Sequence, residues 1–289
     1  MAAASCVVYG FVVAAAGGAW AYFRRYRVVR PPIGLMNGAD LAFMMTAIVL
    51  VPMFYLRVSE AIGIGVLTLG TLGILYLTFE PVLRGRVWIW LASAACIAGV
   101  LAATRLGPAD PAFLAANNAV LVVTVIGAAN LWAQSGMRAR DAALLGGLLI
   151  AYDVTATTLL PHMGHLFTTL QGRPFAPITM WPVTAEPGAL AAIGLGDQLM
   201  AAVFPLVLRK AFGRRAGLTA LVLGLGAIGG LIALPLLGVQ LPIFPVMVVL
   251  GPLMAIQYGW WRRTARERTY QEYLRAEPLA GWPLGRVAR

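Results

Sequence analysis

Long apolar segments dominate this sequence and limit its possible folds more than any other feature. A hydrocarbon core of roughly 30 Å is crossed by about 20 apolar residues in helical form, and nine segments of the chain qualify. They lie near residues 5–22, 40–56, 61–79, 87–104, 114–132, 141–160, 188–208, 216–237 and 241–261. Charged residues make up only 11% of the chain, against about 25% in soluble domains. The pattern predicts an all-α polytopic membrane protein with nine transmembrane helices in one bundle.

Basic residues fall almost entirely on one side of the predicted membrane. Of the 22 Lys and Arg residues, only Arg57, Arg105 and Arg173 lie in the loops of the opposite side. Because short cytoplasmic loops are enriched in Lys and Arg, we expect the N-terminus outside and the C-terminus in the cytoplasm. This distribution accounts for the net charge of +11 without nucleic acid as a partner. The expected partner of the apolar surface is the lipid bilayer.

Two aspartates, Asp153 and Asp197, are the only acidic residues well inside the predicted helices. An ionised side chain at the bilayer centre costs at least about 2.5 kcal/mol, and such residues are usually functional. Their helices, 141–160 and 188–208, are consecutive and antiparallel, and such helices are commonly neighbours. The aspartates lie about seven and about nine residues from the outer ends of these helices, so their depths agree within roughly 3 Å. We therefore expect the two carboxylates to meet.

Two carboxylates held a few Å apart cannot both ionise cheaply, so the pair is expected to share one proton near neutral pH. One carboxylate can then take a proton from water as a general base while its protonated partner polarises a carbonyl group. This division of roles is the chemistry of an aspartyl protease. The sequence does not distinguish which aspartate acts first as the base.

The residues beside the two aspartates resemble those of a known family. Tyr152-Asp153 and Gly194-Leu195-Gly196-Asp197 are similar to the Tyr-Asp and Gly-x-Gly-Asp motifs of the presenilin and signal peptide peptidase family of intramembrane aspartyl proteases. The count of nine helices, with these motifs on the sixth and seventh, also resembles that family. The resemblance covers roughly residues 138–261, and the first five helices match only in number.

A third motif of this family, Pro-Ala-Leu followed by Pro, stands at the start of its ninth helix. Here Leu241-Pro242-Ile243-Phe244-Pro245 occupies that place. Both prolines match, while Ile243 and Phe244 are bulkier than the Ala and Leu that they replace, which is expected to change the shape of the substrate site. Pro242 and Pro245 interrupt the helix, and irregular backbone at membrane depth requires protein or a water-filled cavity around it.

Further residues are expected to support the site. Gly194 and Gly196 remove side chains next to Asp197, so that a substrate backbone or another helix can approach closely. Tyr152 either hydrogen-bonds near the pair or packs as an ordinary aromatic residue. Four polar residues, Asn117, Asn118, Asn130 and Gln198, are expected to make interhelical hydrogen bonds and to take no part in catalysis.

The longest loop, residues 161–187, contains prolines at Pro174, Pro177 and Pro182 among apolar residues. Proline keeps such a segment extended. The loop is either a linker or, on a sharper interpretation, a lid or an edge on which an extended peptide can pair.

Neither a metal site nor a cofactor site is predicted. His162 and His165 are spaced by three residues, but no third ligand type lies nearby. The segment 224–229 matches the dinucleotide pattern G-x-G-x-x-G without the strand and βαβ context that the pattern requires. Cys6 and Cys96 lie in separate apolar segments and are expected to be packed, inert thiols.

The family resemblance implies an enzyme that hydrolyses peptide bonds within transmembrane helices or signal-peptide remnants, without a cofactor. It divides the chain into scaffold helices at 1–137, catalytic helices at 138–261 and a cytoplasmic tail at 262–289, which we expect to be solvated. The predicted orientation matches signal peptide peptidases and implies a preference for substrates whose N-terminus is cytoplasmic. The strong excess of arginine over lysine favours a GC-rich bacterial genome, and hence a bacterial plasma membrane.

Three other functions stay open. A proton-coupled transporter or channel also uses intramembrane carboxylates and broken helices, although the first five helices carry no counterpart to Asp153 or Asp197. A prepilin-peptidase-like enzyme also uses a Gly-x-Gly-Asp motif with a second aspartate, but it would leave the two-proline motif unexplained. A non-catalytic homologue would bind membrane helices without cutting them.

Overall fold

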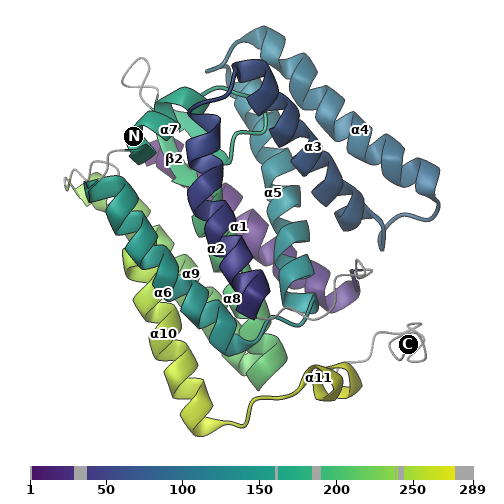
Figure 1. Ribbon diagram of the computed structural model, residues 1–289, viewed down its shortest axis with the longest axis vertical. Helices are drawn as coiled ribbons and strands as arrows, with labels where there is room; N and C mark the ends of the chain where they lie inside the picture. The colour runs from purple at the N-terminus through teal and green to yellow at the C-terminus, as the bar shows by residue number, and fades with distance from the viewer. Residues whose placement is uncertain are drawn as a thin grey trace.

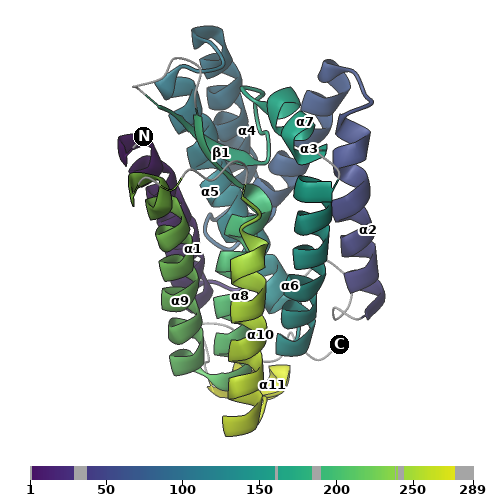
Figure 2. The same ribbon diagram turned by 90° about the vertical axis from the view of Figure 1, so that its left-hand side faces the viewer.

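The computed structural model describes residues 2–28, 38–159, 162–183, 190–237, 239 and 244–276, which form a bundle of helices with one small sheet (Figures 1 and 2). The long helices are α1 (Ala2–Arg25), α2 (Gly38–Tyr55), α3 (Glu60–Phe79), α4 (Arg86–Ala103), α5 (Pro111–Gln134), α6 (Ala139–Val154), α8 (Leu195–Phe212), α9 (Arg214–Ala233) and α10 (Met247–Thr264). Shorter elements are α7 (His162–Leu170), α11 (Tyr270–Ala276), η1 (Thr104–Leu106), η2 (Thr155–Leu159) and η3 (Leu234–Leu237). The sheet pairs β1 (Ile178–Pro182) with β2 (Leu190–Gly194).

Six of the described helices, α1, α2, α3, α4, α5 and α9, are long and apolar enough to cross a membrane. They support the prediction of a mostly helical, membrane-embedded chain. The predicted segments at 141–160, 188–208 and 241–261 overlap α6, α8 and α10, which lie outside this group. Helix α6 has only 16 residues, α8 carries charged residues near both ends, and α10 ends in two arginines.

The sheet is the main departure from the predicted all-helical chain. Residues 190–194, which were expected to begin a helix, form β2 and pair antiparallel with β1 from the proline-containing loop. The register places Ile178 opposite Gly194 and Pro182 opposite Leu190. Short apolar runs such as Leu190–Gly194 do not reveal by periodicity whether they form strand or helix, and here the partner strand decides. The hairpin lies at one end of the bundle, beside α7 (Figure 2).

Local chemistry explains where several helices begin and end. The Asp110 carboxylate accepts a hydrogen bond from the Ala112 N–H at 2.8 Å and is followed by Pro111, a favourable pair of residues at a helix start. Gly213 separates α8 from α9 with φ of 99°, a left-handed conformation that glycine adopts without strain. The tight turn makes α8 and α9 antiparallel neighbours.

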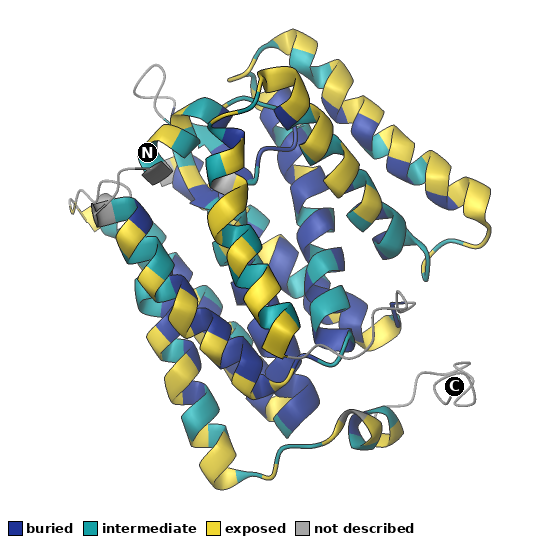
Figure 3. Ribbon diagram, viewed as in Figure 1, coloured by how far each residue is buried: buried dark blue, intermediate teal, exposed yellow. Residues whose placement is uncertain are grey.

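Helix α8 is the centre of the bundle. It packs against α1, α5, α6, α9 and α10, and its fully buried side chains include Val203, Leu206 and Leu208. The main hydrophobic core surrounds α8. A second core lies between α3, α4, α5 and the segment that leads into β1. Figure 3 shows the contrast, because α5 and α8 are largely buried whereas α2 and α4 are largely exposed.

Glycine residues allow helices α6 and α10 to approach each other closely. A Cβ atom added at Gly251 of α10 would lie 2.4 Å from Cγ1 of Ile150 and 3.0 Å from the carbonyl oxygen of Gly146, both in α6. Only a residue without a side chain allows this approach. The two helices therefore lie side by side (Figure 1), and the end of α6 meets the start of α10.

The basic residues at the end of α8 are buried. The Arg209 guanidinium lies 4.7 Å from the centroid of the Trp20 ring, and the Lys210 ammonium donates hydrogen bonds to the carbonyl oxygens of Ala133, at 2.7 Å, and Met137. The Lys210 ammonium thereby supplies hydrogen-bond donors to carbonyl groups at and just after the C-terminus of α5, which lack partners within the helix. The basic residues at this end of the bundle are therefore part of its packed interior.

The described part of the tail is docked, which corrects the expectation of a solvated segment. Tyr273 of α11 is fully buried and stacks on Phe23 with ring centroids 5.6 Å apart. The Glu267 carboxylate accepts a hydrogen bond from the Ala139 N–H at 3.2 Å, and the Arg268 guanidinium donates to the Arg209 carbonyl at 2.7 Å. The tail thereby joins the start of α6 to the end of α8.

Candidate active site

Asp153 lies at the end of α6, immediately before the π-helical turn η2. Its Oδ2 atom accepts a hydrogen bond from the Met247 N–H at 3.3 Å. Met247 is the first residue of α10, where backbone N–H groups lack partners within the helix. The same helix start carries the positive end of the helix dipole. Asp153 therefore ties the end of α6 to the start of α10.

Asp197 lies in the first turn of α8, directly after β2. A Cβ atom added at Gly194 would lie 3.1 Å from Oδ2 of Asp197, so the carboxylate folds back over this glycine. A Cβ atom added at Gly196 would meet nothing within 4 Å, and Gly196 is exposed. The first glycine thus makes room for the carboxylate, and the second leaves the approach to it open.

The two carboxylates come from adjacent helices, because α6 packs against α8. Asp153 and Asp197 lie close enough for their charges to interact, and both are partly buried. The Tyr152 hydroxyl is within electrostatic range of Asp153 and is also partly buried. The structure thus brings together Tyr152, Asp153 and Asp197 from the two motifs.

The third motif is described only in part. Phe244 is exposed, and the carbonyl of Pro245 accepts a hydrogen bond from the Val248 N–H at 3.1 Å in the first turn of α10. Pro242 and Ile243 lie outside the described residues. The described part of the motif leads directly to Met247, whose N–H group donates a hydrogen bond to Asp153.

Buried amides hold the hairpin against the helices. The Asn118 side chain pairs with the backbone of Met180, donating to its carbonyl at 2.8 Å and accepting from its N–H at 3.4 Å. The Asn117 Oδ1 atom accepts from the Phe175 N–H at 2.8 Å. These amides belong to α5, so α5 fixes the position of β1.

Gln198 of α8 also bonds to the hairpin, from the side of Asp197. Its Nε2 atom donates to Thr179 Oγ1 of β1 at 2.7 Å. The Leu195 N–H donates to the Pro177 carbonyl at 2.9 Å, so both neighbours of the Gly196-Asp197 pair are bonded to the loop. Asp197 therefore sits on a helix start that β1 and β2 hold in place.

The predicted roles of the polar residues need correction. Asn130 does bond another helix, donating to the Ala19 carbonyl of α1 at 3.1 Å. Asn117 and Asn118 instead bind the backbone of the loop and of β1, because extended backbone without a ladder partner needs side-chain partners, and Gln198 binds the Thr179 hydroxyl of β1. Two adjacent asparagines within an apolar segment, Asn117 and Asn118, indicated buried hydrogen bonds. Their partners, the backbone groups of Phe175 and Met180, could not be inferred from the sequence.

The described residues contain no group of three or more His, Cys, Asp and Glu side chains that could hold a metal ion. His165 is exposed on α7, and the side chain of His162 is outside the described part. The described site contains two carboxylates, a nearby phenol and a helix start. Comparison with known proteins adds nothing to this picture, since no protein-family model and no curated protein matches the chain.

Proposed function

We propose that this chain is an intramembrane aspartyl protease of the presenilin and signal peptide peptidase type, which hydrolyses peptide bonds within transmembrane helices or signal-peptide remnants. The observation that supports it most is the approach of Asp153 and Asp197 from adjacent helices of a membrane-embedded bundle. The Gly-x-Gly-Asp arrangement supports it further, because Gly194 accommodates the Asp197 carboxylate.

The proposed mechanism needs only the two carboxylates and a water molecule. The ionised carboxylate takes a proton from water, the resulting hydroxide attacks the scissile carbonyl, and the protonated carboxyl donates a hydrogen bond to the carbonyl oxygen. The tetrahedral intermediate then collapses as a proton passes to the leaving nitrogen. One carboxylate again holds a proton at the end, so the pair is ready for the next cycle.

The hairpin is the proposed holder of the substrate. A transmembrane helix hides its peptide bonds in internal hydrogen bonds and must be unwound before it is cut. Because the Asn118 amide occupies the main-chain groups of Met180 on the outer edge of β1, the outer edge of β2 is the one on which an extended peptide can pair. A peptide on that edge would lead toward Asp197, since β2 runs directly into α8.

The proposed topology counts α6, α8 and α10 as membrane helices with the six more apolar ones, which gives nine. Helices α8 and α10 both end in basic pairs, Arg209-Lys210 and Arg262-Arg263. With these ends in the cytoplasm and the N-terminus outside, substrates with a cytoplasmic N-terminus are preferred. The proposed location is a bacterial plasma membrane. A reporter fused to the C-terminus tests the orientation, and activity of that reporter on the outer side would contradict it.

The cleavage assay uses a single-pass helix substrate reconstituted with the purified protein in nanodiscs. Asp197→Asn and Asp153→Asn should each lower the rate at least about a hundredfold, the usual scale for loss of acid–base catalysis. Asp110→Asn is the matched control, because Asp110 is a partly exposed carboxylate that caps α5 away from the site and asparagine caps equally well. Unchanged cleavage by both site variants would overturn the proposal.

A proton-coupled transporter is the second candidate, and one observation favours it. The start of α10 faces the Asp153 carboxylate beside a π-helical turn, and interrupted helices with termini at a midplane carboxylate also build ion sites. Proton flux into vesicles, measured beside cleavage, distinguishes the two. Flux without cleavage would favour transport, and neither activity with retained substrate binding would favour a non-catalytic helix-binding protein.

A further inference from the structure

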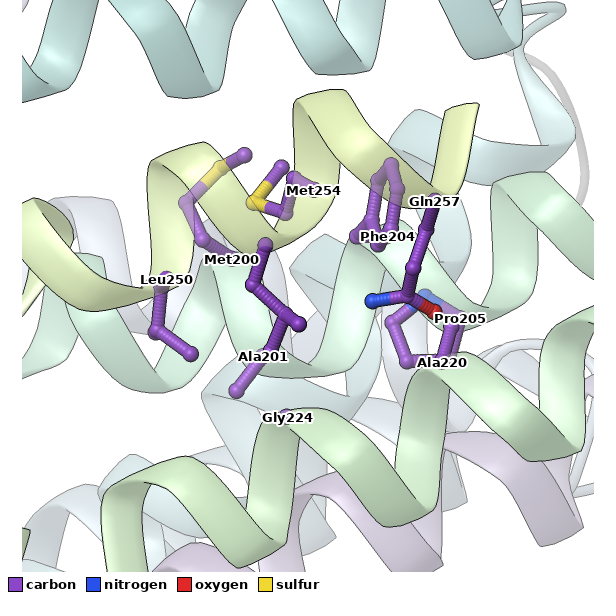
Figure 4. A pocket seen from close by; sticks show the side chains of 10 residues that line it. Met200, Ala201, Phe204, Pro205, Ala220, Gly224, Leu250, Met254 and Gln257 are labelled. Atoms are coloured by element: carbon purple, nitrogen blue, oxygen red, sulfur yellow. The ribbon is translucent and has the colours of Figure 1, made fainter. Parts of the chain in front are cut away.

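A small pocket lies between α8, α9 and α10, apart from the two carboxylates (Figure 4). Its walls are mostly apolar and include Met200, Phe204 and Met254. Two lining residues break that pattern, Gln257 of α10 and Pro205 of α8. Gln257 brings an amide into the apolar interior, and Pro205 removes a backbone N–H donor from it.

Gln257 is only 6% exposed, and within the part of the chain that the structure describes its buried Oε1 atom accepts no hydrogen bond. Pro205 has no N–H group, so α8 cannot supply the usual i+4 donor to the carbonyl of Ala201, another lining residue. Buried acceptors are normally satisfied by protein or by ordered water. A small molecule that donates hydrogen bonds fits this chemistry.

The pocket also has room for such a molecule. Gly224 of α9 lines it and is buried, yet a Cβ atom added there would meet nothing within 4 Å. The free space is about that of one water molecule, which in buried sites typically makes two to four hydrogen bonds. The enclosed space is too small for an organic ligand, and the Gln257 acceptor favours water over an empty apolar cavity.

We propose that this pocket binds water and supplies it to the two carboxylates. On α8, Met200 lies one turn beyond Asp197, and on α10, Leu250 lies one turn beyond Met247, which binds Asp153. Gln257 lies ten residues beyond Met247, about 15 Å along the helix, toward the basic ends of α8 and α10. The pocket thus stands between the carboxylates and the end of the bundle that is cytoplasmic in the proposed topology. Water binding stands independently, and the supply role rests on the proposed protease function.

A matched pair of glycines in α9 tests the pocket. Gly224→Ala adds one methyl group to the pocket, and Gly226→Ala adds the same group at an exposed position two residues away, where a Cβ atom also meets nothing within 4 Å. Neither variant creates a clash, and both gain the same helix propensity. Gln257→Leu removes the acceptor while the space stays similar.

The first readout is independent of proteolysis. The protein is labelled with ¹³C at its methionine methyl groups in nanodiscs, and Met200→Leu and Met254→Leu assign the two pocket signals. We expect water-to-methyl cross-relaxation at Met200 and Met254 in the parent and in Gly226→Ala, and its loss in Gly224→Ala and Gln257→Leu. The buried Met137 is the dry reference, and its unchanged chemical shift shows that each variant is folded. Pocket signals no stronger than that of Met137 in the parent would overturn water binding, as would their persistence in Gly224→Ala.

The second readout tests the supply of water to the carboxylates. Gly224→Ala should lower kcat for a helix substrate several-fold with KM unchanged, while Gly226→Ala keeps both. Equal kcat for the two variants would overturn the supply role. A parent protein with hydrated Met200 and Met254 methyl groups but no cleavage would contradict the protease proposal and leave the water site standing.

Discussion

Helices α3 and α4 differ from helices α8 and α10 in where their polar groups lie. The first pair turns large apolar side chains outward, with Leu69 70% exposed and Trp88 65% exposed, and both helices are apolar enough to cross a membrane. The second pair is less apolar and carries polar groups in the bundle, with Arg209, Lys210 and Gln257 buried and Asp197 partly buried, while α10 also turns Ile256 and Trp260 outward. In this comparison the stronger hydropathy of α3 and α4 accompanies a surface suited to lipid. Weaker hydropathy marks the helices that hold the candidate site.

The largest stability difference is expected between two glycines, one in each region. Gly251→Ala forces a methyl group against Ile150 and the Gly146 carbonyl and should destabilise the protein by about 1–3 kcal/mol, the usual cost of overpacking. Gly65→Ala in α3 meets nothing within 4 Å and should stabilise it by up to about 1 kcal/mol through helix propensity. Unfolding in mixed micelles measures both. Equal effects would show that α6 and α10 are not closely packed.

A second, smaller difference separates two asparagines of α5. Asn118→Leu removes both hydrogen bonds to Met180 and leaves backbone groups unpaired, at a cost of about 1–3 kcal/mol that falls mainly on the hairpin. Asn130→Leu removes bonds to α1 and should weaken the bundle without loosening the hairpin. Hydrogen exchange of residues 178–182 distinguishes the two. We expect faster exchange, and slower substrate cleavage, only for Asn118→Leu.

Some of these features could be predicted from the sequence and others could not. The positions of α1 to α5 and of α9 follow from hydropathy alone, because each is a long apolar run, whether it faces outward, as α2 and α4 do, or is largely buried, as α5 is. The approach of Asp153 to Asp197 was predicted from their place on neighbouring helices, but the predicted depths of about seven and nine residues were wrong, because Asp153 lies at the end of α6 and Asp197 in the first turn of α8. The Met247 hydrogen bond to Asp153 was not predicted, because it depends on where α10 begins after a proline-containing segment.

The strand pairing and the docking of the tail could not be predicted either, because both depend on partners distant in the sequence. Residues 190–194 form an apolar run that fits a helix or a strand equally well, and their partner strand, residues 178–182, lies in a separate segment of the sequence. Docking of the tail depends on Tyr273, Glu267 and Arg268 each finding a partner more than a hundred residues away or at the end of α8. Local sequence patterns carry no information on such distant partners.

The smallest expected effect concerns this tail. The Thr269 N–H donates to the Glu272 carboxylate at 2.7 Å and, with Arg266 nearby, holds the pKa of Glu272 below its usual range. A carboxyl whose pKa is lowered by folding stabilises the fold above its unfolded pKa, and the contribution is lost as the pH falls through its folded pKa. Exchange of residues 270–276, corrected for intrinsic rates, should therefore accelerate in acid below the ordinary glutamate pKa. Glu272→Gln should remove part of this pH dependence, and an identical profile would contradict the role of Glu272.

The central claim is that Asp153 and Asp197 together activate water against a peptide bond inside a membrane helix. The most direct measurement is mass spectrometry of a single-pass substrate after incubation in H₂¹⁸O with the parent protein, Asp153→Asn and Asp197→Asn. The parent should produce a new C-terminus within the apolar stretch that carries ¹⁸O, and neither variant should produce it. An intact substrate with the parent, or the same product with both variants, would contradict the claim.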